Sequence, residues 1–287
     1  MRYPAVAGRF YPSDRSDLTD LVENCFRHEC GPGSVPEEDG SDVRCVLAPH
    51  AGLAVSGPIA AHAFAELRRG GHRDAYIIIG PDHYGQPFDL VMCSEPYLTP
   101  MGECPVNMEI AGRLREHIRD SPNAHRFEHS IEVELPFLQF IDPKAEIVPI
   151  IMGRQDIGTA RKLADAIRDS TKGMDVAIIA SSDLMHYVPD RVEKELDRKF
   201  LERVLAHDIE GMYSTLRRYD MSVCGYGPIA ASIMATEPKS SRLLSHSNSW
   251  ETIHYDRDAV VGYAAAAFYR FRSGSRSHPP SSRPHIL

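Results

Sequence analysis

Three histidines follow apolar runs that are typical of buried strands. The run VRCVLA leads to His50, AYIIIG leads to His83, and DVAIIA leads to His186. In open parallel sheets, ligands bind outside the carboxyl ends of the strands, so we expect these side chains to meet at one edge. Imidazole binds transition metals and transfers protons near neutral pH. A lone histidine after a strand is more often a hydrogen-bonded loop residue, but three in matching contexts favour a shared site.

Cys224 stands in the glycine-rich turn SVCGYGP, directly before an expected helix. The positive end of a helix dipole lowers the pKa of a thiol and favours the thiolate, which is the form that binds metals. The alternative is a small buried cysteine packed under the turn. Together with the three histidines, Cys224 predicts one metal-type site.

A segment dense in ionisable groups, EHSIEVELP, contains His129 and Glu132. One interpretation places both at the rim of the same crevice, as proton carriers or as partners of the ligands. The alternative is that Glu132 is only a favourable acid in the first turn of a helix. We interpret the remaining histidines without such a context as surface or helix-face residues: His28, His62, His72, His117, His125, His207, His246 and His254.

Bulk properties exclude several functional classes. The formal charge of −8 on 287 residues argues against a general binder of nucleic acid or anionic membranes. The longest nearly apolar stretch, 259–269, is too short to span a bilayer, and the start of the chain lacks the apolar region of a secretory signal. Six cysteines without a C-x-x-C pair predict no disulfide framework, which favours a reduced cytoplasmic protein.

The elements that must position these residues alternate between strands and helices. The apolar runs are continuous rather than alternating, which is typical of strands covered on both faces. We therefore predict an α/β fold with a mainly parallel or mixed central sheet flanked by helices, in a single domain over 1–270. The Ser/Pro/Arg-rich tail, 271–287, is predicted to be disordered. Strands are expected at 43–48, 75–80, 89–93, 146–152, 175–180 and 259–269. Helices are expected at 14–28, 58–69, 106–119, 130–141, 158–170, 189–206, 209–218 and 228–235.

Five motifs resemble those of one known family, the Memo family, whose prokaryotic members are called AmmeMemoRadiSam system protein B. The resemblance covers nearly the whole chain up to the tail. The motifs are APHAG (48–52), GPDHYG (80–85), EHSIEVELPFL (128–138), SSDLMHY (181–187) and CGYGP (224–228).

The resemblance implies a fold like that of class III extradiol dioxygenases, which hold iron with two histidines and one glutamate. In Memo-like proteins a cysteine replaces that glutamate, so the implied metal ligands here are His50, His83 and Cys224. The animal protein has two consecutive histidines in the second motif, whereas this chain has His83 and Tyr84. A thiolate is softer than a carboxylate, which shifts the preference toward copper, zinc or a more covalent iron site. Dioxygenase activity is therefore not implied by the fold.

The resemblance also implies an acid/base role for His186, with Asp183 and His129 lining the pocket. The first functional hypothesis is redox chemistry on a small molecule at a mononuclear site holding iron or copper, with zinc as an alternative. The second is a module that binds a peptide or phosphopeptide without turnover. The third, implied by the prokaryotic family name, is an accessory component that works with a radical-SAM partner protein.

Overall fold

The computed structural model describes residues 1–270, so the predicted disordered tail lies outside the described residues. The strands are β1 (Val43–Ala48), β2 (Ala75–Pro81), β3 (Leu90–Met92), β4 (Tyr97–Thr99), β5 (Gly102–Cys104), β6 (Arg119–Asp120), β7 (Ile147–Met152), β8 (Val176–Ser181), β9 (His186–Val188), β10 (Ser240–Asn248) and β11 (Val260–Tyr269). The α-helices are α1 (Arg15–Arg27), α2 (Leu53–Gly70), α3 (Met108–Leu114), α4 (Leu135–Ile141), α5 (Ile157–Ser170), α6 (Asp190–Leu205), α7 (Ile209–Tyr219), α8 (Tyr226–Thr236) and α9 (Ser249–Ile253). Two 3₁₀ turns are η1 (Pro122–His125) and η2 (Glu132–Glu134).

The central sheet is mixed, which confirms the predicted fold class. Its strand order is β10-β11-β1-β8-β2-β7-β3-β6, and β9 pairs with β11 beside this path. The four middle strands, β1, β8, β2 and β7, run parallel to one another. The pairs β1–β11, β10–β11 and β3–β7 are antiparallel.

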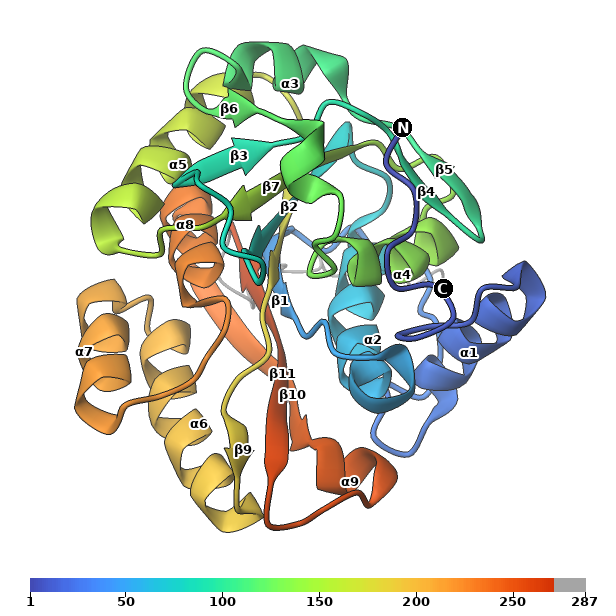
Figure 1. The fold of residues 1–287 in the computed structure, drawn as a ribbon, viewed down its shortest axis with the longest axis vertical. Coiled ribbons are helices and arrows are strands. Elements are labelled where there is room, and N and C mark those ends of the chain that lie inside the picture. Colours follow the sequence, from blue (N-terminus) through green and yellow to red (C-terminus); the bar gives the residue numbers. More distant parts are fainter. Residues whose placement is uncertain (271–287) are drawn as a thin grey trace, which may run out of the picture.

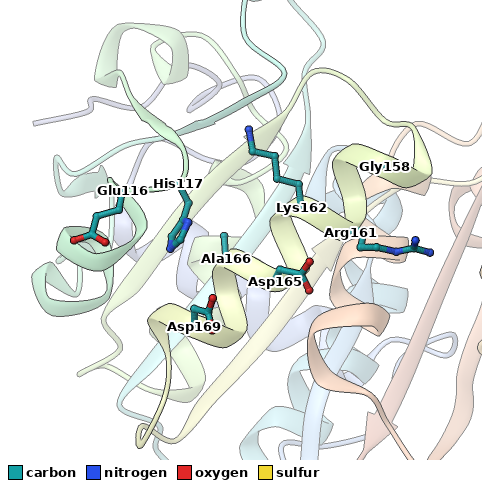
Figure 2. Close-up of a pocket in the computed structure, with 8 residues that line it drawn as sticks. All are labelled: Glu116, His117, Gly158, Arg161, Lys162, Asp165, Ala166 and Asp169. Carbon is teal, nitrogen blue, oxygen red and sulfur yellow. The ribbon is translucent and has the colours of Figure 1, made fainter.

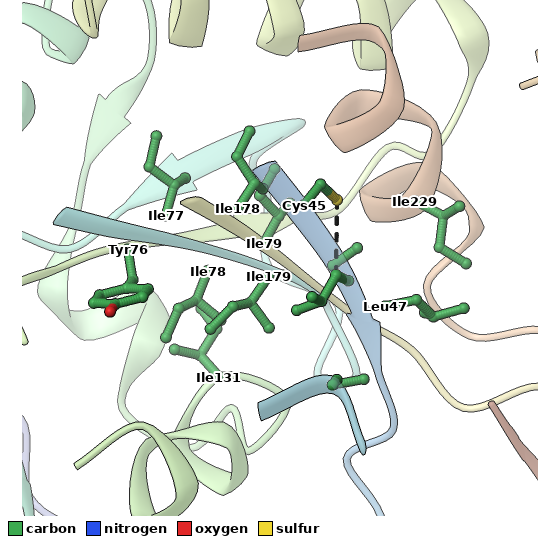
Figure 3. Close-up of a cluster of buried hydrophobic side chains, with 14 of the residues drawn as sticks. Cys45, Leu47, Tyr76, Ile77, Ile78, Ile79, Ile131, Ile178, Ile179 and Ile229 are labelled. Carbon is green, nitrogen blue, oxygen red and sulfur yellow. Dashed lines mark hydrogen bonds between the residues drawn. The ribbon is translucent and has the colours of Figure 1, made fainter. Parts of the chain in front are cut away.

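Helices cover both faces of the sheet, as the continuous apolar runs require. Helix α2 packs on β1 and β11 and also contacts α1 and α4. Helix α8 packs on β1, β2 and β8 and contacts α5 (Figure 1). Ile77, Ile78 and Ile79 follow one another along β2 with no exposed surface, so each face of this strand is buried. Figure 3 shows these isoleucines with those of β8, Leu47 of β1 and Ile229 of α8. Burial of each such side chain contributes about 1.5–3 kcal/mol.

The predicted elements differ from the observed ones mainly where polar and irregular segments occur. The helix expected at 106–119 is shorter, because only Met108–Leu114 is helical. The helix expected at 130–141 begins as the 3₁₀ turn η2 and continues as α4. Strand β10 was not predicted, because its sequence SSRLLSHSN is polar and lies at the sheet edge.

One edge of the sheet gathers the segments that carry the predicted site. Because β1, β2 and β8 are parallel neighbours, their carboxyl ends lie at the same edge. The residues that follow them, 49–50, 82–83 and 182–186, therefore come together. None of the described helices is both long and apolar enough to cross a membrane.

Candidate functional site

His50 follows β1 and is 1% exposed. Its main-chain N–H donates to Asp183 Oδ1 over 2.8 Å, which ties the end of β1 to the segment after β8. Its ring nitrogen Nδ1 lies 2.7 Å from the Ser181 hydroxyl, and its Nε2 lies 3.4 Å from Cys224 Sγ. Nε2 is therefore the nitrogen that faces the thiol.

His83 follows β2 and is held by Glu128. The main-chain N–H of His83 donates to Glu128 Oε2 over 2.7 Å, and His83 Nδ1 lies 2.8 Å from Oε1. The carboxylate can only accept, so Nδ1 carries the hydrogen and Nε2 remains for a ligand. His129 stacks on His83 with ring centroids 4.4 Å apart, and the His50 ring meets the His83 ring edge-on at 5.2 Å.

Charges around these rings set their protonation. Burial alone would lower the pKa of His83, but its hydrogen bond to Glu128 and that group's charge outweigh burial and raise the pKa. Burial disfavours the charged form of Glu128, yet contacts with His83 hold the pKa of this carboxyl at about 2. Burial and the neighbouring His83 lower the pKa of His129 to about 4. Glu128 is thus a carboxylate and His129 a neutral imidazole at physiological pH.

His186 lies at the start of β9, beyond the end of β8. Its main-chain N–H donates to Ser222 Oγ over 2.8 Å, and its Nδ1 lies 2.9 Å from the carbonyl oxygen of Ser222. A carbonyl only accepts, so Nδ1 is protonated and Nε2 can take up a proton. Asp183, which is 5% exposed, lies three residues earlier and anchors the main chain of His50. The structure therefore brings His186 and Asp183 to the same strand edge.

Cys224 lies in the loop between α7 and α8. Its Sγ accepts the main-chain N–H of Asp183 over 3.2 Å. We expected the following helix to lower the thiol pKa, and this expectation was wrong. Burial raises the pKa of Cys224, and the charge of Asp183 raises it further. A cation bound against Sγ would restore the thiolate, because coordination deprotonates a thiol.

These side chains form three overlapping groups of ligand atoms. In each group, the ligand atoms lie within 4.8 Å of one another. The groups are His50–His83–Cys224, His83–Glu128–His129 and Asp183–His186–Cys224. The six residues predicted as ligands or proton carriers in these groups therefore lie at one edge, and Cys224 belongs to both the group with His83 and the group with His186.

Comparisons with known proteins identify the family. A family model described as Memo-like protein matches residues 2–267. A curated relative from Caldivirga maquilingensis, named a MEMO1 family protein, is 39% identical over 280 residues, which are 94% of this chain and 99% of the relative. Another from Methanopyrus kandleri is 40% identical over 281 residues, with the same coverage of 94% and 99%. The chain belongs to the Memo family.

A solved structure, that of an uncharacterized protein from Escherichia coli K12, resembles this Memo-family chain in fold. The TM-score is 0.54 at 11% sequence identity, and the match covers 79% of this chain and 99% of the other. At this identity the likeness concerns the fold alone. It supports the mixed α/β architecture and carries no statement about chemistry.

Behind His50, this Memo-family chain buries a hydroxyl with three partners. Ser181 Oγ lies 2.6 Å from the carbonyl oxygen of Ser130, 2.8 Å from Glu134 Oε1 and 2.7 Å from His50 Nδ1. A hydroxyl has one hydrogen, and the Ser130 carbonyl can only accept it. Both other partners must therefore donate to Ser181. His50 carries its hydrogen on Nδ1, and Glu134 is a protonated acid.

Burial agrees with this assignment of protons. Glu134 has no exposed surface, and burial raises the pKa of its carboxyl well above the usual range. Its Oε2 is buried without a hydrogen-bond partner among the described residues, as suits a neutral acid better than a carboxylate. The two histidines thus differ in support: His83 rests on an ionised Glu128, while His50 rests on a neutral Ser181–Glu134 pair.

Glu132 is not at the rim of the site, contrary to the functional interpretation of its segment. It has no exposed surface and pairs with Arg2, and it accepts main-chain N–H groups of Ala5 and Val6. It also accepts the hydroxyl of Tyr11. Glu132 therefore anchors the N-terminal segment.

Of the histidines assigned to the surface or a helix face, His125 is fully buried and His246 is partly buried. His125 has no exposed surface, and its Nδ1 lies 2.7 Å from the Tyr97 hydroxyl while its Nε2 lies 3.2 Å from the Val91 carbonyl oxygen. His246 contacts Glu193 and Asp197 from β10. Neither location could be predicted from local context, because the partners are distant in the sequence.

Sequence reasoning missed Glu128, Ser181 and Glu134 as supports of the site. Glu128 lies in a motif that we had singled out, but we assigned the functional role to its neighbours. Ser181 lies in the motif SSDLMHY, in which only Asp183 and His186 were assigned roles. No local signal distinguishes Glu134, because its role follows from its burial behind Ser181.

A hollow away from this edge has a different character (Figure 2). It lies along α5 and the segment after α3, and none of the site residues lines it. Its charged side chains are of both signs, which fits a solvated helix face better than a site for one ligand. The residues are Glu116, His117, Gly158, Arg161, Lys162, Asp165, Ala166 and Asp169.

Proposed function

We propose that His50, His83 and Cys224 hold one metal ion, iron or copper, that serves redox chemistry on a small molecule. The observation that carries the proposal is the convergence of three ligand atoms at the strand edge, where His50 Nε2 lies 3.4 Å from Cys224 Sγ. Two imidazoles and a thiolate form a soft donor set that suits copper, iron or zinc. Iron or copper, when bound, supplies one-electron chemistry.

The surrounding hydrogen bonds favour ligation by the two histidines. Each ring has its Nδ1 occupied, His50 by Ser181 and His83 by Glu128. Metal-bound histidines commonly donate their other ring N–H to such a partner, which fixes the ring orientation. The hydrogen bonds therefore orient both rings for metal binding without the help of an ion.

Two further histidines are suited to proton transfer. His186 has a free Nε2 because its Nδ1 donates to the Ser222 carbonyl. His129 is neutral because its pKa is lowered to about 4, and it stacks on His83. In this proposal His186 accepts or returns a substrate proton beside Cys224, His129 lines the opposite wall, and Asp183 fixes the main chain of His50.

Elemental analysis of protein purified without oxygen tests the metal site. We expect about one iron or copper per chain in the wild type, and loss of that metal in Cys224→Ser and in His50→Ala. Cys30→Ser and His62→Ala are matched controls, because both residues are partly buried and lie outside the site. Undiminished metal in Cys224→Ser and His50→Ala contradicts the assignment.

A binding role without turnover is the second candidate, and exposed aromatic side chains favour it. Tyr84, Phe127 and Tyr187 are 51%, 58% and 75% exposed, and each is the chain neighbour of a site residue. Tyr187 also adopts a left-handed backbone with φ of 57°, a strained conformation for a bulky residue. This function would be favoured over redox chemistry by two results together. Metal-free protein would bind a phosphopeptide with full affinity, and Tyr187→Ala would abolish that binding.

A further inference from the structure

A second cluster of ligand-type side chains lies outside the strand-end site. Glu193 and Asp197 are four residues apart on α6, so they lie on one face of the helix. His246 reaches them from β10. Both acids have no exposed surface, whereas the side chain of His246 is 19% exposed and connects the cluster with solvent.

Two of the three separations between the ligand atoms match those around a bound metal ion. His246 Nε2 lies 3.0 Å from Glu193 Oε1 and 3.4 Å from Asp197 Oδ2. With metal–ligand bonds of about 2.0–2.2 Å, neighbouring ligand atoms are about 3.0 Å apart in octahedral and about 3.4 Å apart in tetrahedral coordination. All three ligand atoms lie within 4.8 Å of one another, so one ion can contact them after small movements of the side chains.

The second oxygen of each carboxylate is held by a donor from elsewhere in the fold. Glu193 Oε2 accepts from the side-chain amide of Asn248 over 2.7 Å. Asp197 Oδ1 accepts the main-chain N–H of Met185 over 3.1 Å. Such outer hydrogen bonds orient ligating carboxylates. Each acid thus directs its remaining oxygen toward His246.

The backbone of β11 leaves room for this cluster at Gly262. A Cβ atom at this position would lie 2.0 Å from Asp197 Oδ2 and 2.7 Å from Glu193 Oε1. Any side chain would therefore displace the two inward-facing oxygens. The glycine lets both carboxylates approach the strand closely.

The cluster carries negative charge that protons offset in the protein alone. Two nearby cations, Lys194 and Arg257, pair with Asp190. Burial and the neighbouring Glu193 raise the pKa of Asp197 to about 7, against the opposing effect of His246. Burial opposes charging of His246, but the two carboxyl groups raise its pKa to about 9. A divalent cation would replace these protons and neutralise the carboxylates.

We propose that Glu193, Asp197 and His246 form a second metal site that binds a divalent first-row ion, Zn²⁺ or Mn²⁺. One imidazole and two carboxylates are harder donors than the two imidazoles and thiolate at the strand edge, so the two sites differ in metal preference. The bound ion would tie α6 to β10 and, through Asp197 and Met185, to the segment that carries His186. This inference does not depend on the proposed function.

Metal binding in a chain with a disabled strand-end site tests the inference. The variant His50→Ala/His83→Ala/Cys224→Ser, which removes a ligand from each of the three strand-end groups, would be titrated with Zn²⁺ by calorimetry and with Mn²⁺ by electron paramagnetic resonance. We expect about one ion of either metal per chain. Adding His246→Gln or Asp197→Asn should abolish this binding. The control is His254→Gln, at an exposed histidine that caps the end of the neighbouring α9, and it should leave the binding unchanged.

Folding and the first site are monitored in the same variants. His246→Gln is the milder change because its side chain is partly exposed, and circular dichroism would verify that each variant is folded. With Co²⁺, only the strand-end site should give thiolate charge-transfer absorption, so His246→Gln in the otherwise wild-type chain should keep that band. Absence of stoichiometric Zn²⁺ and Mn²⁺ from the folded triple variant would overturn the inference and leave a proton-bridged ion-pair network. If Co²⁺ bound to the wild-type protein gave no thiolate charge-transfer band, that result would instead count against the proposed function.

Discussion

One carboxylate, Glu128, holds His83 at two points, the imidazole ring and the main chain. Its Oε1 lies 2.8 Å from His83 Nδ1, and its Oε2 accepts the His83 main-chain N–H over 2.7 Å. The ring is therefore fixed both by its own hydrogen bond and through the backbone that carries it. This double contact makes Glu128 the support of His83, one of the proposed metal ligands.

Glu128→Gln should weaken metal binding about 10–100-fold, which is the usual cost of removing an outer partner of a histidine ligand. A glutamine can accept one of the two hydrogen bonds but lacks the charge that raises the basicity of the ring. Competition with a chromophoric chelator would measure the affinity for Zn²⁺. Glu109→Gln, an exposed carboxylate paired with Arg113, is the control. Equal affinities of the two variants would mean that Glu128 does not support a ligand.

Ser181→Ala should affect both stability and metal binding. The change leaves the buried Nδ1–H of His50 and the acid proton of Glu134 without their acceptor, at a cost of about 1–3 kcal/mol for each unpaired group. It also frees the His50 ring to rotate, so Zn²⁺ affinity should fall as well. Urea unfolding and chelator competition would measure the two effects.

Ser170→Ala is the matched control for Ser181→Ala. Ser170 is 1% exposed, and its hydroxyl has no hydrogen-bond partner among the described residues. This variant should keep both the stability and the metal affinity of the wild type. A Ser181→Ala protein that matched it in both measurements would contradict the proton arrangement behind His50.

Glu132→Ala should destabilise the fold by about 3–5 kcal/mol, because it leaves Arg2 as an uncompensated buried charge. It also removes the acceptor of the Ala5 and Val6 main-chain N–H groups. Chemical denaturation would measure the free energy of unfolding. Glu109→Ala breaks only an exposed pair with Arg113 and should cost less than about 1 kcal/mol. A similar small loss for Glu132→Ala would show that the N-terminal segment is held by other contacts.

The strand-end histidines could be predicted because their position depends on a local pattern. Continuous apolar runs mark strands buried on both faces, and parallel strands end at a common edge, so His50 and His83 follow from the sequence alone. The supports of these residues could not be predicted in the same way. The contact between His83 and Glu128 joins residues 45 positions apart, and that between His50 and Ser181 joins residues 131 positions apart.

The second cluster escaped prediction for a related reason. Its histidine lies on β10, a polar edge strand without an apolar run, and its acids lie on a helix rich in charge. Among many surface carboxylates, nothing local distinguishes Glu193 and Asp197 as buried. Their burial depends on β11 passing close by at Gly262, which is a property of the tertiary fold.

The stability of the protein should fall on acidification because of His125. Burial and the charge of Arg2 together lower the pKa of His125 to about 3. A hydrogen bond to the Val91 carbonyl and the charges of Glu128 and Asp120 oppose this shift. The unfolded chain has a histidine pKa near 6.5, so below that pH the unfolded state binds a proton that the folded state does not. The contribution of His125 is therefore fully present above pH 6.5 and is lost as the pH falls toward 3. The slope from this group should approach about 1.4 kcal/mol per pH unit.

His125→Gln separates this effect from that of other buried histidines. Glutamine has no ionisable group but can still donate to the Val91 carbonyl or accept from the Tyr97 hydroxyl. Urea unfolding between pH 6.5 and 4 should therefore show a shallower decline for the variant than for the wild type. His117→Gln, a change at an exposed histidine, should retain the wild-type slope. Parallel declines of the wild type and His125→Gln would mean that His125 becomes protonated without unfolding, which would contradict its assignment as a neutral residue of the core.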